Sequence, residues 1–506
     1  MNKKIFSQAA ILTCVTIISK ITGFLREYSL ARAFGTSYQA DAYTIALNVP
    51  VIIFSSFMVA VSSCYISMYA TIKHENSEAD AMKFTNNIGT ITTLIAGCFA
   101  ILIILFPEVV VKIFASGFTG EAYLLTVKLV QLSAIMLLAM PLAQIFAAFL
   151  QIYNQPSIAA ANNILYNIIM ICAFMCSDML GITGIALIGG LAYFSQIVVQ
   201  YPFLRKHSFK PRPYLTIDRN ILSLCKLILP ILVSSAVLEI NTLIDRTMAS
   251  GLIEGSVSSL NYAKKLTDLF FGVMTVSISA IVYPKLTELY AEGNTVRLQK
   301  LFKVSFQVIC IISVPLLILT MVFSKEVVQI IYGHGSFSEE SVALTGDALF
   351  FYAIGMVFCA TRDLLTKVFY AIKKTRVAMI NSIFATVANI VLNFILIKPF
   401  GHCGLAFASS ISMGITSILL VFSLNDEMDV DKRELLYDVL KASVVAIILG
   451  IVCKFVYSLF PICSLLHTTL CVAIFVIAYL LVYGIACYLM RIGIIRDVVL
   501  SLKLRK

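Results

Sequence analysis

The chain has 506 residues, of which 60% are apolar and only 13% are charged. A soluble domain carries roughly 25% charged residues, and a chain this apolar could not cover its surface in water, so the composition excludes a soluble globular fold. The net charge of +11 does not indicate a nucleic-acid-binding protein, because the basic residues lie mostly in short segments between apolar runs, as in membrane proteins.

Fourteen segments are long and apolar enough to cross a bilayer, which takes roughly 20 residues. In chain order they are 8–34, 41–72, 85–115, 121–152, 156–178, 182–204, 220–250, 256–288, 300–323, 342–371, 376–399, 403–424, 436–460 and 465–490. We therefore expect an all-α integral membrane protein of about fourteen transmembrane helices. Because the number is even, both termini would lie on one side of the membrane.

Basic residues accumulate in alternate breaks between these segments. They are Lys3 and Lys4, then Arg205, Lys206, Lys210, Arg212 and Arg219, then Arg297 and Lys300, then Lys373, Lys374 and Arg376, then Lys432 and Arg433, and finally Arg491, Arg496, Lys503, Arg505 and Lys506. The intervening loops 35–40, 116–120, 179–181, 251–255 and 461–464 contain no Lys or Arg. The positive-inside rule then predicts a bacterial plasma-membrane protein with both termini on the cytoplasmic side.

The chain also repeats itself at a nearly constant offset. The matching positions are Tyr43 and Tyr262 (219 apart), Asn162 and Asn381 (219 apart), and the segments 181–186 and 401–406 (220 apart). This offset indicates a duplicated six-helix unit. Six is even, so the two units would share one orientation and be related by a pseudo-twofold axis along the membrane normal.

The duplication predicts three parts of the chain. They are an N-lobe of helices 1–6 (1–215), a C-lobe of helices 7–12 (216–430), and two further helices with a basic tail (431–506). No loop is long enough to form a globular domain, so any chemistry must take place among the helices.

Several charged residues lie within predicted spans, where a charge normally faces a partner or a wet cavity. They are Lys20, Arg26, Glu27 and Arg32 in the first span, Asp41 in the second, Glu239, Asp245 and Arg246 in the seventh, Lys264, Lys265 and Asp268 in the eighth, and Arg362, Asp363 and Lys367 in the tenth. If the two repeats face each other, these groups converge on one cavity. Cations outnumber anions there, which suits an anionic substrate such as pyrophosphate.

Structural explanations compete with this interpretation. Arg32, Lys264 and Lys367 could lie near helix ends and reach the interface with their charged groups. Glu27 could neutralise Lys20 or Arg26. Arg362 and Asp363 could form an ion pair, although neighbours on a helix do not face each other. Arg26, deep in its span, is the hardest of these residues to explain by structure alone.

The sequence offers no signal for catalysis or for a resident metal. The 13 cysteines are scattered singly along apolar runs, and the five histidines form no ligand pair. We find no phosphate-binding Gly loop before a helix and no Ser/His/Asp set with readable spacing. We therefore expect a transporter rather than an enzyme, with no cofactor.

Three groups of residues resemble the MurJ (MviN) lipid II flippase family of the multidrug/oligosaccharidyl-lipid/polysaccharide exporter superfamily. The first is residues 19–27 (SKITGFLRE) with Phe34-Gly35 and Asp41-Ala42-Tyr43. The others are Gly255-Ser256-Val257-Ser258 with Tyr262-Ala263-Lys264-Lys265-Leu266, and Tyr332-Gly333-His334-Gly335-Ser336-Phe337 with Arg362-Asp363 and Phe369-Tyr370-Ala371. Together they span most of the chain.

The resemblance implies movement of undecaprenyl-pyrophosphate-linked peptidoglycan precursor to the outer leaflet by alternating access. Family residues of the headgroup site carry over to Arg26, Asp41 and Ser258, while Lys20 and Lys265 stand where the family commonly has Arg. An Arg pair that many members have near Phe54 and Ser55 is absent, which leaves the headgroup geometry open. We add Arg362 to the predicted substrate site, with Glu27, Lys264 and Asp268 as supporting charges.

The coupling ion and the partners are less well specified. Some family members bind sodium through a seventh-helix carboxylate and eleventh-helix polar residues, so Glu239 and Asn381 are the sodium candidates here. Ala385, one turn after Asn381, offers no carboxylate, and we leave the coupling ion open. The expected partners are the lipid-linked glycolipid, membrane lipids and the cell-wall synthesis machinery.

Three other functions remain as alternatives. A relative in the same superfamily would carry another polyprenyl-linked polysaccharide precursor or a cationic drug, and a drug exporter should have a cavity rich in carboxylates. A membrane glycosyltransferase or lipid phosphatase would need an acidic metal or acid/base site, and the sequence shows none. A non-transporting scaffold would leave the charges within the spans unexplained.

Overall fold

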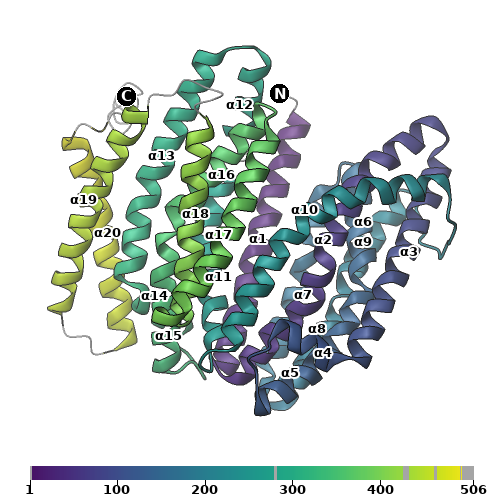
Figure 1. The fold of residues 1–506 in the computed structure, drawn as a ribbon, viewed down its shortest axis with the longest axis horizontal. Coiled ribbons are helices and arrows are strands. Elements are labelled where there is room, and N and C mark those ends of the chain that lie inside the picture. The colour runs from purple at the N-terminus through teal and green to yellow at the C-terminus, as the bar shows by residue number, and fades with distance from the viewer. Residues whose placement is uncertain (1–2, 278–281, 425–431, 461–463, 491, 493–506) are drawn as a thin grey trace. The chain divides into compact units, whose positions relative to one another are not determined.

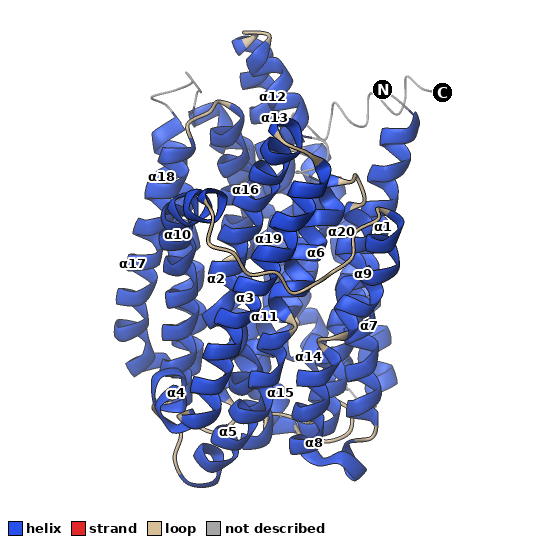
Figure 2. Ribbon diagram, turned by 90° about the vertical axis from the view of Figure 1, so that its right-hand side faces the viewer, coloured by secondary structure: helices blue, strands red, loops and turns tan. Residues whose placement is uncertain are grey.

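The computed structural model describes residues 3–277, 282–424, 432–460, 464–490 and 492. Every regular element in these ranges is a helix, as Figure 2 shows, so the predicted all-α fold is confirmed. Most of the basic C-terminal tail predicted after residue 490 lies outside the described residues.

Ten of the described helical spans are long and apolar enough to cross a membrane. A bent pair, α15 (Glu339–Ile354) and α16 (Met356–Ala371), makes an eleventh, with an angle of 42° between its halves. The remaining three predicted spans correspond to the long helices α1 (Lys3–Phe34), α10 (Arg219–Ser250) and α11 (Ser256–Ser277). Those three helices carry most of the charges that the sequence places within spans.

The chain packs as two compact units (Figure 1). The first comprises residues 1–258 and 335–337. After α1 and before α10 it contains α2 (Tyr38–Glu75), α3 (Glu78–Leu105), α4 (Pro107–Phe114), α5 (Gly120–Ser133), the 3-10 helix η1 (Ala134–Leu138), α6 (Met140–Ile152), α7 (Pro156–Met175), α8 (Ser177–Ala192) and α9 (Ser195–Lys206). Pro107 and Pro156 each begin a helix, where the absence of an N–H group does no harm.

The second unit comprises residues 259–334 and 338–506. Besides most of α11, and α15 and α16, it contains α12 (Tyr283–Ala291), α13 (Thr295–Val322), α14 (Ser324–Tyr332), α17 (Thr375–Phe400), α18 (His402–Leu424), α19 (Lys432–Ser458) and α20 (Leu465–Leu489). The predicted lobe boundaries at 216 and 431 follow the sequence repeat and stay a prediction.

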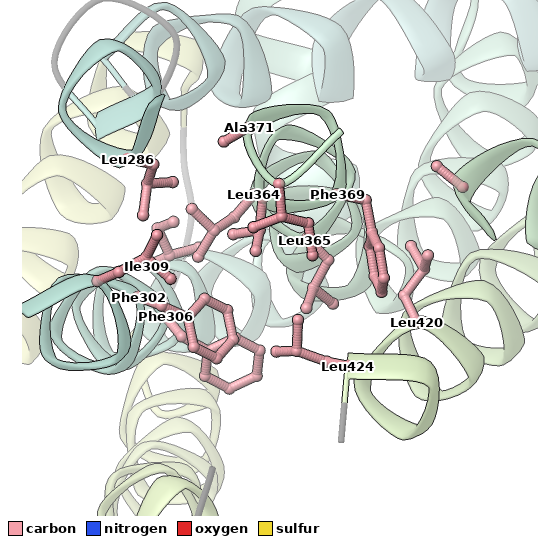
Figure 3. Close-up of a cluster of buried hydrophobic side chains, with 14 of the residues drawn as sticks. Leu286, Phe302, Phe306, Ile309, Leu364, Leu365, Phe369, Ala371, Leu420 and Leu424 are labelled. Carbon is pink, nitrogen blue, oxygen red and sulfur yellow. The ribbon is translucent and has the colours of Figure 1, made fainter. Parts of the chain in front are cut away.

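One hydrophobic cluster of the second unit is built mainly from large apolar side chains of α13, α16 and α18, and a second one joins α13 to α19 and α20. Figure 3 shows Phe302 and Phe306 of α13 beside Leu364 and Leu365 of α16, with Leu424 of α18 completing the cluster. All five are buried. Since lipid chains are as apolar as these side chains, close packing rather than exclusion of water holds such helices together.

Glycines at equivalent positions of the repeat share an unusual backbone conformation. Gly181 has φ of 59° and Gly401 has φ of 55°, and neither would meet another atom within 4 Å if it carried a Cβ. Gly35 (φ 56°) and Gly255 (φ 84°), also 220 positions apart, form a second pair. Left-handed backbone favours glycine, so these pairs support the predicted duplication.

Candidate functional site

Arg26 of α1 lies within a network of hydrogen bonds in the first unit. Its Nη2 donates to Glu27 Oε1 at 2.6 Å and its Nη1 to Asn167 Oδ1 of α7 at 3.3 Å. The guanidinium carbon lies 5.5 Å from the centre of the Tyr166 ring, within the range of a cation–π contact. The Arg26 side chain keeps 27% of its surface exposed, whereas Glu27 and Asn167 are buried.

Asn167 holds the position of this guanidinium. Its Nδ2 donates to Thr22 Oγ1 at 3.2 Å and to the Ser19 carbonyl at 3.5 Å, so the same amide bonds α1 at two further points. Sequence reasoning missed Asn167. An amide in the middle of an apolar run, which is costly unless bonded, is the signal that could have found it.

The ion pairs between chain neighbours differ in quality. Arg362 and Asp363 are 3.9 Å apart, at the limit of an ion pair, as expected for adjacent residues on a helix. Arg26 and Glu27 are equally adjacent in the chain, yet their charged groups lie 2.6 Å apart. Glu27 therefore does neutralise Arg26 in part, one of the structural explanations raised by the sequence. Lys20, six residues before Arg26 on the same helix, is exposed.

Asp41 and Ser258 are in direct contact. The buried carboxylate of Asp41 accepts hydrogen bonds from the Gly255 N–H at 2.8 Å and the Ser258 N–H at 2.7 Å. These N–H groups lie at the start of α11, where backbone donors have no partner within the helix and a negative charge is favourable. The structure thus brings these two predicted site residues together as a helix cap.

The loops around this cap approach each other closely. We call residues 34–38, 115–120, 250–256 and 335–337 the loop cluster; all belong to the first unit. Ser336 N donates to the Arg32 carbonyl at 2.9 Å, and a Cβ on Gly335 would lie 2.4 Å from the same oxygen. A Cβ on Gly117 would lie 2.2 Å from Gly251 Cα. Only glycine fits at such approaches.

A second charged cluster lies in the second unit, at the bend between α15 and α16. A cavity of about 60 Å³ is lined by Lys264 and Asp268 of α11 and by Gly355 and Cys359. Arg362 Nη2 donates to Cys359 Sγ at 3.7 Å. Lys264, Asp268 and Arg362 are therefore brought together as predicted site neighbours. Lys265 is half-buried on the same helix.

The two sodium candidates each bond to a serine. Ser55 Oγ donates to Glu239 Oε1 at 2.7 Å in the first unit, and Asn381 Nδ2 donates to Ser423 Oγ at 3.3 Å in the second. Within the described part of the chain, no group of three or more His, Cys, Asp and Glu side chains is arranged to hold a metal ion.

The sequence profile of the family described as "Lipid II flippase MurJ" matches residues 30–489. The chain belongs to this family. A flippase family is a family of transporters, and together with the many apolar helices this makes the chain a multi-pass inner-membrane protein.

Named MurJ relatives align with most of the chain. A "Probable lipid II flippase MurJ" of Buchnera aphidicola subsp. Baizongia pistaciae is 26% identical over 419 residues, 81% of each chain. That of Thermotoga maritima is 27% identical over 418 residues, 82% of this chain and 84% of the relative. The "Lipid II flippase MurJ" of Burkholderia cenocepacia is 23% identical over 424 residues, 81% of each.

Solved structures show the same fold. "Lipid II flippase MurJ, inward closed conformation" superimposes with a TM-score of 0.79 at 23% identity, covering 94% of this chain and 98% of that one. An inward-facing multidrug resistance MATE family transporter of the MOP superfamily superimposes with a TM-score of 0.65 at 14% identity, covering 83% and 98%. The MurJ fold thus extends over nearly the whole chain, including most of the residues that the MATE match leaves out.

Proposed function

We propose that this chain is a lipid II flippase that moves the undecaprenyl-pyrophosphate-linked peptidoglycan precursor from the inner to the outer leaflet by alternating access. The observation that carries the proposal is Arg26, an arginine within the first predicted span that Asn167 holds in place and whose side chain keeps 27% of its surface exposed. The two bonds named above use two of the five N–H donors of the group, and a planar fork of this kind suits a pyrophosphate oxygen pair.

The proposal assigns the headgroup to cations that the sequence places within membrane spans. They are Lys20, Arg26, Lys264, Lys265 and Arg362. A wet cationic path lowers the desolvation penalty that a pyrophosphate headgroup meets at bilayer depth. The polyprenyl tail stays in lipid while the headgroup crosses. Transport makes and breaks no covalent bond, so the proposal includes neither catalysis nor a cofactor.

Asp41 and Ser258 have a different part in this proposal. Their buried contact ties the loop cluster together, so we assign them to closing one end of the pathway rather than to contacting substrate. The loops of this cluster carry no Lys or Arg between residues 115 and 120 or between 250 and 256. With the termini on the cytoplasmic side, as the sequence predicts, these loops would lie at the outer face of the membrane.

Functional replacement tests the proposal. A host depleted of its lipid II flippase is transformed with this chain, and growth and lipid II exposure on the outer leaflet are measured. Rescue is the expected result. A well-expressed protein that fails here but restores export of another polyprenyl-linked polysaccharide precursor would overturn the lipid II assignment while keeping the flippase mechanism.

A further inference from the structure

The segment that joins α9 to α10, residues 207–218, lies along α3 and is hydrogen-bonded to it. We call it the linker; Figure 2 shows it as the tan loop that runs across the helices and ends at α10. Alternate backbone N–H groups of the linker donate to side chains on one face of α3: Arg212 to Asn86, Tyr214 to Thr90, and Thr216 to Asn87, each at 3.0 Å. Asn87 Nδ2 returns a bond to the Thr216 carbonyl at 2.6 Å. The backbone of the linker is therefore held at three successive points.

Aromatic packing fixes the beginning of the linker. Phe209 is fully buried against Phe149, with ring centres 4.8 Å apart. His207 lies over the Tyr153 ring with centres 4.3 Å apart. Because both ends of the docked part are held, the linker forms a stable wall for whatever lies beneath it.

A cavity of about 380 Å³ lies between the linker and helices α3, α6 and α9. Its walls are mainly apolar, with Leu94, Leu142, Phe146 and Ile197 among them. The buried hydroxyl of Thr93, which also lines the cavity, has no hydrogen-bond partner among the described residues. Leu94 and Tyr201, which both line the cavity, are 53% and 43% exposed, so the cavity reaches the surface of these helices.

The linker and the end of α9 carry cations and exposed apolar side chains together. The segment 205–218 contains four Lys and Arg residues and a single acidic residue, Asp218, whose carboxylate accepts from the Ile221 N–H at the start of α10. The guanidinium of Arg205 lies 5.5 Å from the centre of the Tyr201 ring, and Arg212 and Tyr201 both line the cavity. Leu215 is 61% exposed and Ile217 77%. Basic and apolar side chains on one segment beside membrane helices are typical of contact with an anionic lipid surface.

We propose that this cavity binds one anionic phospholipid, with an acyl chain between α3, α6 and α9 and the phosphate at Arg212 and Arg205. The apolar walls exclude free phosphate as the main ligand, and the unbalanced positive charge favours an anionic over a zwitterionic headgroup. The bound lipid links the leaflet to the linker, which is the connection between the two predicted lobes. It is a site distinct from the proposed substrate chamber and does not depend on the transport proposal.

The chain contains no tryptophan, which gives a direct test. Tyr201→Trp places a single fluorophore at the cavity, and the full-length protein is reconstituted in phosphatidylcholine vesicles containing a minor share of lipid with brominated chains. We expect brominated phosphatidylglycerol to quench this tryptophan with an apparent affinity at least about five-fold higher than brominated phosphatidylcholine. Phe394→Trp, on an exposed position of α17, reports ordinary lipid contact and should show no such preference.

Two further changes separate the parts of the proposal. Arg212→Gln should reduce the preference about five-fold, since one basic residue near an anionic surface contributes about 1 kcal/mol. Arg297→Gln, an exposed arginine outside the linker, should leave it unchanged. Thr93→Phe should fill the cavity and weaken quenching by both brominated lipids; if this variant fails to fold, the exposed Arg212 variant still decides the question.

The outcomes that would overturn the proposal are equally specific. Equal quenching by the two brominated lipids at Tyr201→Trp would remove the anionic site. An equal preference at Phe394→Trp would show a general surface effect rather than a site at the linker. Millimolar inorganic phosphate that abolishes the preference would mean that the site recognises a free anion instead of a phospholipid.

Discussion

The carboxylate of Asp41 lies 2.7 Å from the backbone nitrogen of Ser258, a residue 217 positions later in the chain. Asp41 is buried and also accepts from Gly255, so it satisfies two N–H groups at the start of α11 at once. The contact joins the start of α2 to the start of α11, which is the second span of the predicted second repeat. Gly255, one of the two donors, belongs to the loop cluster, so the contact fixes this part of the cluster to the start of α2.

Replacing Asp41 should weaken this closure. Asp41→Ala leaves two buried N–H groups without their acceptor, which we expect to lower the free energy of unfolding by about 1–3 kcal/mol for each group left unsatisfied. The measurement is thermal unfolding of the purified protein in detergent. Glu121→Ala, an exposed carboxylate at the start of α5, should change stability by no more than about 0.5 kcal/mol. Equal effects of the two changes would contradict the capping role.

Two glycines have nearly the same backbone conformation but differ in how closely their neighbours approach, so comparing them distinguishes the two effects. Gly335 (φ 68°) and Gly293 (φ 69°) have nearly the same backbone, but a Cβ would lie 2.4 Å from the Arg32 carbonyl oxygen at Gly335 and in open space at Gly293. Gly293→Ala should therefore cost only the roughly 1–2 kcal/mol of left-handed backbone. Gly335→Ala should cost more, because the loop cluster must separate. Thermal unfolding of both variants checks this, and similar losses would show that the cluster is loosely packed.

Asn167 should control the position of the Arg26 guanidinium. A hydrogen bond to a charged group contributes about 1.5–3 kcal/mol, so Asn167→Ala should slow lipid II flipping in proteoliposomes by about 10- to 100-fold. The control is Asn163→Ala on the same helix, where Asn163 accepts from Gln196 and not from Arg26. A full flipping rate in the Asn167 variant would show that Arg26 needs no positioning residue.

Membrane potential should bias the cycle if the chamber is cationic. A potential acts on each elementary charge with about 2.3 kcal/mol per 100 mV, and an inside-negative potential favours outward movement of an anion and inward return of an empty cationic site. Flipping in liposomes should therefore rise when such a potential is imposed with potassium and valinomycin. A flipping rate that stays constant across imposed potentials would show that the cations of the proposed chamber do not couple transport to the membrane potential.

The sequence predicts the helices of this protein better than their breaks. Long apolar runs specify membrane spans because the bilayer demands them, and within the described residues all fourteen predicted spans coincide with helices or broken helices. The 42° bend between α15 and α16 was not predicted. At the bend, Gly355 packs closely against Ser410 of α18, where a Cβ would lie 2.8 Å from the hydroxyl oxygen. Such a tertiary contact leaves no periodic signal in the chain.

For the candidate site, too, the sequence predicts some features and not others. Arg26 stands out in the sequence because a deep charge is costly wherever it occurs, and the resemblance supplied Asp41 and Ser258. The contact between Asp41 and Ser258 joins residues far apart in the chain, and neither periodicity nor composition specifies it. Nor could the docking of the linker be predicted, because Asn86 and Asn87 become linker contacts only once α3 lies beneath residues 210–216.

The most direct test of the account is the flipping rate of Arg26→Ala beside that of the wild-type chain, measured with purified protein and lipid II in liposomes. The exposed Arg297→Ala variant is the control for loss of a positive charge. We predict that wild type and Arg297→Ala flip lipid II at similar rates, while Arg26→Ala loses at least about ten-fold, as expected for removing one charge-assisted hydrogen bond. Equal rates for Arg26→Ala and wild type would contradict the claim that this arginine handles the pyrophosphate headgroup.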